Sequence, residues 1–186
     1  MLTVLPTGAA SGTLIGDNKI LTAGHVYDGS KEILATFPNG DVLPVKRLWR
    51  SDVADLAILE VEYPRGYRGA KIDCDPVRAG DEIWVVGGPR GNPFHVRWAV
   101  THGYVSTLGL LIDPKLLEEE PDFAPLIALD VSGWKGNSGG PVFNDNGKVV
   151  GILTAGMVAG GMFGGGPIGI AMMTPATEFC RAASLA

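Results

Sequence analysis

The sequence has few cysteines, no long apolar run and no excess of basic residues. Lys and Arg number 15 against 20 Asp and Glu, for a formal net charge of −5, so the clustered basic surface of a nucleic-acid-binding protein is not expected. No apolar segment approaches the ~20 residues that a membrane-spanning helix needs. The amino terminus lacks the charged and apolar segments of a secretory signal peptide. We therefore expect neither nucleic acid nor membrane as a partner.

Cysteine is limited to Cys74 and Cys180, and neither lies in the close spacing of a metal-binding motif. We expect two unpaired thiols, with a Cys74–Cys180 bridge as the alternative. Unpaired thiols are typical of a reducing compartment. Together with the missing signal peptide, they favour a cytoplasmic or a virus- or phage-encoded protein. No metal or other cofactor is expected.

What the sequence does contain is glycine, at 27 residues, within a chain that is 46% hydrophobic. Many short apolar segments alternate with turn signals, which is typical of a β-sandwich or a pair of barrels. Thr174 and Pro175 then form a helix start, and residues 176–183 favour a short helix. The predicted strands span residues 19–22, 33–37, 42–49, 56–61, 82–87, 95–101, 104–112, 126–129, 141–143, 148–154 and 168–172.

The most informative segment is Gly136-Asn137-Ser138-Gly139-Gly140-Pro141. A serine among small residues can be presented on a tight turn, because glycine adopts backbone angles that other residues avoid. Backbone N–H groups of Gly136, Asn137 and Ser138, above all those of Gly136 and Ser138, could then stabilise the oxyanion of an acyl-transfer intermediate. The segment predicts a nucleophile loop.

Two further polar residues precede this loop in the order His, Asp, Ser, one of the chain orders in which a catalytic triad occurs. His25 follows the apolar segment 19–22, and Asp55 directly precedes the apolar segment 56–59. An imidazole can take the serine proton, and a carboxylate can fix its tautomer. His95 and His102 lack such a context, and Asp52 is the competing acid, which we interpret as a solvated loop residue.

These motifs resemble those of chymotrypsin-fold serine peptidases, and most of all the bacterial Deg (high-temperature-requirement) type. The resemblance covers roughly residues 11–175 and implies an all-β fold of two six-stranded antiparallel Greek-key barrels with a short C-terminal helix. It implies a single module, residues 1–186, with one barrel in 1–66, another in 67–174 and the helix in 175–186. Other segments that carry it are residues 11–15, 79–87, 101–106 and 166–171.

The resemblance also assigns the primary specificity pocket. It places Ser132 at the pocket's base and Leu153, Thr154 and Ala155 on one wall, with packing of the barrel as the alternative role for the wall residues. An uncharged base implies a small or medium apolar residue before the scissile bond. Asn137 stands where the digestive branch of the family has an aspartate that pairs with a new amino terminus, so we expect activity without that salt bridge.

Together these features predict a serine endopeptidase that cleaves polypeptides through an acyl-enzyme, with His25, Asp55 and Ser138 as its triad. A viral or phage maturation protease, a catalytically silent binding module of the same fold and an esterase are the alternatives. The chain has no segment that would form a carboxyl-terminal PDZ domain, which puts chaperone function and cage assembly in doubt. Oligomerisation is possible but nothing in the sequence indicates it.

Overall fold

The computed structural model describes residues 1–5, 8–16, 18–28, 31–51, 53–62, 66–90, 96–109, 118, 125–158 and 167–184. Within these ranges strands dominate, and no helix is long and apolar enough to cross a membrane. In chain order the elements are β1 (Leu2–Leu5), β2 (Gly8–Ala10), β3 (Thr13–Ile15), β4 (Lys19–Thr22), α1 (Gly24–Asp28), β5 (Glu32–Thr36), β6 (Val42–Arg50), β7 (Ala57–Val61), β8 (Glu82–Gly87), β9 (Ala99–Thr107), β10 (Ile127–Leu129), β11 (Pro141–Asn144), β12 (Val149–Val158), β13 (Pro167–Pro175) and α3 (Ala176–Ser184).

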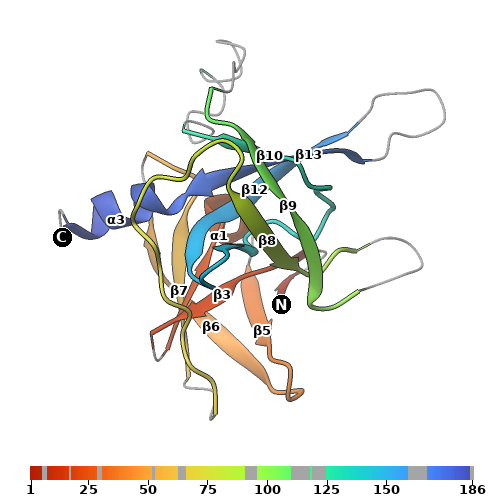
Figure 1. Cartoon of the computed structure of the whole chain (residues 1–186). Helices are drawn as coiled ribbons and strands as arrows, with labels where there is room; N and C mark the ends of the chain where they lie inside the picture. Colours follow the sequence, from red (N-terminus) through yellow and green to blue (C-terminus); the bar gives the residue numbers. More distant parts are fainter. Residues whose placement is uncertain are drawn as a thin grey trace.

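The strands form two sheets, which lie against each other in Figure 1. The first has seven strands in the order β2-β1-β5-β6-β7-β4-β3, and the second is a closed barrel in the order β10-β13-β12-β11-β8-β9. The predicted all-β class with a terminal helix is thus confirmed. The first sheet differs in detail, because it has seven strands and no hydrogen bonds join its two edge strands in the described residues.

The first sheet is nevertheless strongly curved. Its two edge strands, β2 and β3, are consecutive in the chain and are joined by Ser11 and Gly12 alone. A chain spans at most about 3.6 Å per residue, so the two edges lie within roughly 11 Å of each other at this link. The link also places Ser11 where the first sheet meets the second.

Each sheet encloses an apolar core, and β12 contributes to both. Val149 and Ile152 lie in the first core and Val150 and Leu153 in the second, on either side of a register irregularity in the pairing of β12 with β11. Phe179 of α3 packs against the first core as well, although α3 follows directly on β13 of the second sheet. The two halves are therefore joined by shared side-chain packing.

Several elements differ from the sequence predictions. The two strands expected on either side of residues 102 and 103 are one strand, β9, in which Gly103 leaves room for a close neighbour: a Cβ there would lie 2.1 Å from the Asp130 carbonyl oxygen. Pro175 ends β13, paired with Gly151, and the helix begins at Ala176. Strands β1 and β2 are not among the predicted strands, and β1 pairs with both β2 and β5.

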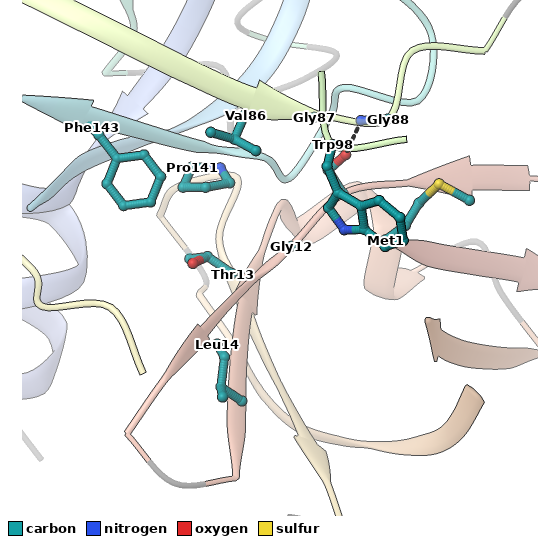
Figure 2. A pocket seen from close by; sticks show the side chains of 11 residues that line it. Met1, Gly12, Thr13, Leu14, Val86, Gly87, Gly88, Trp98, Pro141 and Phe143 are labelled. Atoms are coloured by element: carbon teal, nitrogen blue, oxygen red, sulfur yellow. Dashed lines mark hydrogen bonds between the residues drawn. The ribbon is translucent and has the colours of Figure 1, made fainter. Parts of the chain in front are cut away.

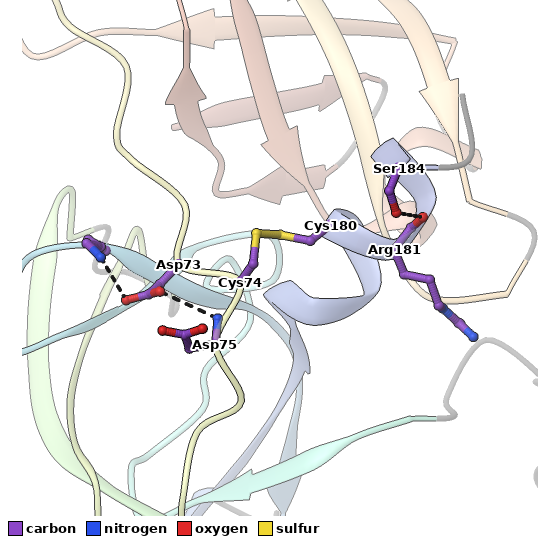
Figure 3. The surroundings of a disulfide bond; sticks show 7 residues. Asp73, Cys74, Asp75, Cys180, Arg181 and Ser184 are labelled. Carbon is purple, nitrogen blue, oxygen red and sulfur yellow. Dashed lines mark hydrogen bonds and ion pairs between the residues drawn. A yellow bond between two sulfur atoms is a disulfide. The ribbon is translucent and has the colours of Figure 1, made fainter.

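A disulfide joins Cys74, in the segment before β8, to Cys180 on α3 (Figure 3). The expectation of two unpaired thiols is therefore wrong, and the alternative is correct. Strand β12 brings the two residues together: Asp73 N donates to Val149 O at 2.8 Å on one side, and α3 packs on β12 on the other. The cysteines are 106 residues apart in sequence, so only the tertiary structure reveals their proximity.

Loss of this disulfide should destabilise the fold. Replacing both cysteines by serine is expected to lower the free energy of unfolding by about 2–4 kcal/mol, because the bridge closes a long loop in the unfolded chain. The measurement is urea denaturation of wild type and Cys74→Ser/Cys180→Ser, with reduced wild type as the control. Identical midpoints for oxidised and reduced wild type would contradict a stabilising bridge.

Candidate active site

His25 lies on α1, the short helix that follows β4. Three of the four β4 residues are buried, which fixes the strand end and hence the start of α1. Gly24 precedes the histidine and contacts Arg50 of β6 so closely that a Cβ would lie 2.5 Å from the guanidinium carbon. Glycine at this position lets β6 approach the helix. The His25 side chain is 51% exposed.

Asp55 lies in the connection between β6 and β7 and is 3% exposed. Both of its carboxylate oxygens accept hydrogen bonds from His25: Oδ1 from the backbone N–H at 2.8 Å, and Oδ2 from Nδ1 at 2.9 Å. Because an ionised carboxylate can only accept, the ring proton is on Nδ1 and Nε2 is left as the basic nitrogen. The structure thus joins two of the three predicted triad residues.

The pKa of His25 lies above its ordinary value of 6.5, as the net result of effects that act in opposite directions. Burial of the ring is the largest single effect and lowers the pKa, and the nearby Arg50 lowers it further. The hydrogen bond from Nδ1 to Asp55 and the charge of Asp55 raise it, with a smaller contribution from Asp28. The carboxylate therefore stabilises the imidazolium more than burial destabilises it.

Arg50 ties the helix of His25 to the loop of Asp55, a role that the sequence analysis missed. Its Nη1 donates to Ala54 O at 3.0 Å, directly beside Asp55 in the chain. Its Nη2 pairs with Asp28, the last residue of α1, at 3.0 Å. Sequence patterns do not single out Arg50, because it is one of several charged residues along β6.

Ser138 lies on the turn between β10 and β11, in the loop of residues 134–140 that we call the nucleophile loop. Its hydroxyl donates to Thr154 O of β12 at 3.3 Å, a long and hence weak contact for a hydroxyl donor. No hydrogen bond joins Ser138 to His25 among the described residues. Gly139 nevertheless packs against the chain leading to His25, since a Cβ there would lie 2.1 Å from Thr22 Oγ1 and 3.1 Å from Ala23 N.

Every carbonyl oxygen from Lys135 to Ser138 accepts a hydrogen bond. The donors are Arg90 N to Lys135 O, Ser11 Oγ to Gly136 O, Gly140 N to Asn137 O and Ser11 N to Ser138 O, at 2.7–2.8 Å. A trans peptide directs its N–H opposite to its carbonyl. Anchored carbonyls therefore fix where each N–H group of the nucleophile loop points.

From Gly136 to Gly140, the N–H groups of Gly136 and Ser138 have no acceptor among the described residues, whereas those of the other three residues do. The N–H groups of Gly136 and Ser138 are the pair favoured from the sequence as oxyanion donors. Asn137 N–H instead donates to Trp134 O at 3.0 Å. Inclusion of Asn137 among the oxyanion donors is therefore corrected, because its N–H is already engaged by a carbonyl of the same loop.

The Asn137 side chain is buried beneath the nucleophile loop. It is 5% exposed, and its Oδ1 has no hydrogen-bond partner among the described residues. Gly87 at the end of β8 makes room for it, since a Cβ there would lie 2.6 Å from Oδ1. An amide tolerates such a position far better than a carboxylate, because a buried unpaired charge is costly.

The residues assigned to the primary pocket lie on two neighbouring segments. Leu153 and Thr154 of β12 are almost fully buried, Leu153 within the second core and Thr154 with its hydroxyl 2.8 Å from that of Thr174. Ala155 and Ser132 are partly exposed. The backbones of the two segments touch next to Ser132, because a Cβ on Gly133 would lie 2.8 Å from Gly156 Cα. That contact narrows the space between them.

The remaining titratable candidates lie elsewhere. His102 is exposed on β9, between Trp84 and Tyr104, and its Nε2 lies 2.6 Å from Glu82 Oε1. This is a surface packing position, outside the candidate active site. Asp52 and His95 lie outside the described residues.

Known proteins resemble this chain in sequence. A probable periplasmic serine protease of the Do/HhoA-like kind from Haemophilus influenzae is 32% identical over 174 residues, which are 92% of this chain and 35% of that protein. The periplasmic pH-dependent serine endoprotease DegQ of Escherichia coli is 34% identical over 171 residues, 90% of this chain and 35% of DegQ. The chain thus spans about a third of the length of these relatives.

Solved structures resemble the fold. The HtrA-type protease AlgW with a tripeptide superimposes with a TM-score of 0.81 at 23% identity, covering 98% of this chain and 57% of that chain. A serine endoprotease from Yersinia pestis gives a TM-score of 0.73 at 22% identity, covering 98% of this chain and 59% of that chain. These likenesses confirm the chymotrypsin-like fold predicted from the sequence.

The relatives overturn the expected location. Their names place them in the periplasm, so the expectation of a cytoplasmic or virus- or phage-encoded protein is wrong. That expectation depended in part on unpaired cysteines, and the Cys74–Cys180 disulfide removes this part of its basis.

The family model described as the trypsin-like peptidase domain matches residues 10–152. The match begins just before Ser11 and includes His25, Asp55 and the whole nucleophile loop. The Deg-type resemblance noted from the motifs agrees with the serine proteases found by sequence similarity. This chain belongs to the trypsin-like peptidase domain family.

Proposed function

We propose that the chain is the protease module of a serine endopeptidase, with His25, Asp55 and Ser138 as its catalytic triad. The observation that carries the proposal is the double hydrogen bond between His25 and the buried Asp55. It leaves Nε2 as the only free basic nitrogen of the ring. A histidine held in this way is suited to take a proton and give it back.

The reaction begins when Ser138 Oγ attacks the carbonyl carbon of the scissile peptide bond and His25 Nε2 accepts the hydroxyl proton. The Ser138 hydroxyl must first turn from Thr154 O, a contact weak enough to be exchanged. The C–N bond of the tetrahedral intermediate then breaks, and the imidazolium gives its proton to the leaving amine. Water, deprotonated by the same nitrogen, hydrolyses the acyl-enzyme and restores Ser138.

The N–H groups of Gly136 and Ser138 would bind the negative oxygen of both tetrahedral intermediates. Support comes from the anchored carbonyls of the nucleophile loop, which keep these two N–H groups free of internal acceptors. Donors that are already oriented need no reorganisation as the charge develops. Ser138 thus supplies both the nucleophile and one oxyanion donor.

We propose a polypeptide substrate with an uncharged, small or medium apolar residue before the scissile bond. Ser132 would form the base of the pocket and Leu153, Thr154 and Ala155 one wall. The contact between Gly133 and Gly156 supports a shallow pocket, since a long side chain would need that space. None of these four residues carries a carboxylate that could pair with a cationic substrate side chain.

The relatives suggest the wider setting of this module. They support a periplasmic location for the chain, which suits a disulfide-bonded protein. We propose that the chain forms one protease module, with residues 1–66 and 67–174 as its two halves and 175–186 as the terminal segment.

A fluorophosphonate probe tests the proposed nucleophile and separates an enzyme from a silent binding module. Wild type should gain one adduct by intact mass, and Ser138→Ala should gain none, because the probe reacts only with an activated serine. Ser106→Ala, at an exposed serine on β9, is the matched control and should label like wild type. Folded wild type without an adduct would contradict the proposal.

The pH dependence of labelling tests the pairing of His25 with Asp55. In wild type the acidic limb should lie above pH 6.5, because Asp55 raises the pKa of His25 and the protonated ring cannot act as base. Asp55→Asn should move the limb to lower pH, since the remaining effects of burial and Arg50 both lower that pKa. The rate at neutral pH should fall roughly 10³–10⁴-fold.

The matched control is Asp145→Asn, at an exposed turn carboxylate, which should leave the profile unchanged. A limb at the same pH in Asp55→Asn and wild type would show that Asp55 does not set the basicity of His25.

Substrate specificity is tested with peptides that differ only in the residue before the scissile bond. Wild type should cleave after Ala or Val at least roughly 100-fold more efficiently than after Arg, because a buried cation without a partner is costly. Ser132→Asp should raise the relative kcat/KM for Arg if Ser132 forms the base. Preference for Arg in wild type would contradict the proposed pocket.

A further inference from the structure

Ser11 is a buried residue that links the first sheet to the nucleophile loop. It lies between β2 and β3, where the two edges of the first sheet approach each other, and is 4% exposed. Sequence patterns place it in a strand-like segment and assign it no chemistry. Its side chain and backbone nevertheless contact three elements around the candidate active site.

All the hydrogen-bonding groups of Ser11 are engaged. Its backbone N–H donates to Ser138 O at 2.8 Å, and its hydroxyl donates to Gly136 O at 2.7 Å. The same hydroxyl accepts from Gly88 N at 3.0 Å, and Ser11 O accepts from Thr22 Oγ1 at 2.8 Å. One residue therefore connects the nucleophile loop, the end of β8 and the end of β4.

Ser11 contacts the nucleophile loop at Gly136 O and at Ser138 O, and along the chain these two carbonyls flank the Ser138 N–H group. The peptide between Gly136 and Asn137 is held at both ends, by Ser11 Oγ at the carbonyl and by Trp134 O at the N–H. This peptide lies between the N–H groups of Gly136 and Ser138, neither of which has an internal acceptor among the described residues. If it could rotate, both groups would lose their common orientation, since each is attached to a neighbouring peptide.

We propose that Ser11 is a positioning residue for the oxyanion site, and this inference rests on the proposed function of the nucleophile loop. Its hydroxyl holds Gly136 O away from the substrate side and so keeps the Gly136 and Ser138 N–H groups aimed at the developing oxyanion. Ser11 does not touch the substrate. It acts through the orientation of one peptide, which is the geometry on which oxyanion stabilisation depends.

Ser11 lies between the nucleophile loop and a pocket. On one side Gly140 is a close neighbour, since a Cβ on Gly140 would lie 3.3 Å from Ser11 Cβ. On its other side Ser11 lines a pocket of about 190 Å³ between the two sheets. Figure 2 shows this pocket, with Gly88 at its edge and a dashed hydrogen bond at the Gly88 amide.

Kinetics of Ser11→Ala test the inference, because this change removes the hydroxyl and keeps the backbone N–H that binds Ser138 O. We expect kcat for a peptide substrate to fall about 10- to 100-fold, less than loss of an oxyanion donor itself causes. KM should stay within about twofold, since the oxyanion forms only after binding. Affinity for a peptide boronic acid should fall as far as kcat/KM, while affinity for the product peptide should not change.

The matched control is Thr13→Ala, which removes another buried hydroxyl two residues away, at the start of β3, from a residue that lines the same pocket. Among the described residues the Thr13 side chain makes no hydrogen bond to the nucleophile loop. It should keep the wild-type kcat and boronic acid affinity. Equal losses in both variants, or a Ser11→Ala enzyme with wild-type kcat, would overturn the positioning role and leave the proposed function intact.

A measurement without catalysis keeps the two proposals separate. Amide hydrogen exchange of Gly88 N–H, followed by NMR, should be at least about tenfold faster in Ser11→Ala than in wild type, because its acceptor is gone. The amide resonances of Gly136 and Asn137 should shift in the same variant. Unchanged exchange and unchanged resonances would overturn the inference even if wild type proved inactive, whereas inactive wild type with the expected changes would count against the proposed function alone.

Discussion

The arrangement of the candidate site depends on hydrogen bonds to the carbonyl oxygens of the nucleophile loop. Four consecutive carbonyls, from Lys135 to Ser138, are held by donors from outside the loop or from its own end. Because each peptide is planar, a held carbonyl also fixes the neighbouring N–H. The loop can therefore hold the N–H groups of Gly136 and Ser138 in place although no acceptor among the described residues binds them. The donors are Ser11, between β2 and β3 of the first sheet, Arg90, after β8 of the second sheet, and Gly140 of the loop itself, so the arrangement depends on both halves of the chain.

A second constraint is the balance of charges around His25. Burial and Arg50 oppose its protonation, and Asp55 favours it more strongly. Arg50 nevertheless contributes to the site, because it binds both Ala54 O and Asp28 and so holds the Asp55 loop against α1. Arg50 thus lowers the pKa of His25 through its charge, and it also helps to hold Asp55 where its carboxylate raises that pKa.

The two halves of the chain are joined by core packing and a disulfide as well as by the contacts of the nucleophile loop. Strand β12 supplies side chains to both cores. Helix α3 follows the last strand of the second sheet but packs against the first core, and the Cys74–Cys180 disulfide links this helix to the segment before β8. Such shared packing makes the relative position of the sheets part of the core. His25 follows a strand of the first sheet and Ser138 lies between two strands of the second. The contact between these two halves is therefore stabilised by the hydrophobic effect as well as by hydrogen bonds.

The sequence by itself determined the all-β class, the terminal helix and the segments that carry His25, Asp55 and Ser138. These are local properties, because short apolar runs, glycine-rich turns and polar residues at strand ends are visible in single segments. Only the tertiary structure decided the seven-strand sheet, the disulfide and the roles of Ser11 and Arg50. Each of these depends on contacts between residues far apart in the chain, and Ser11 meets Gly136 across 125 positions, a contact that local pattern cannot encode.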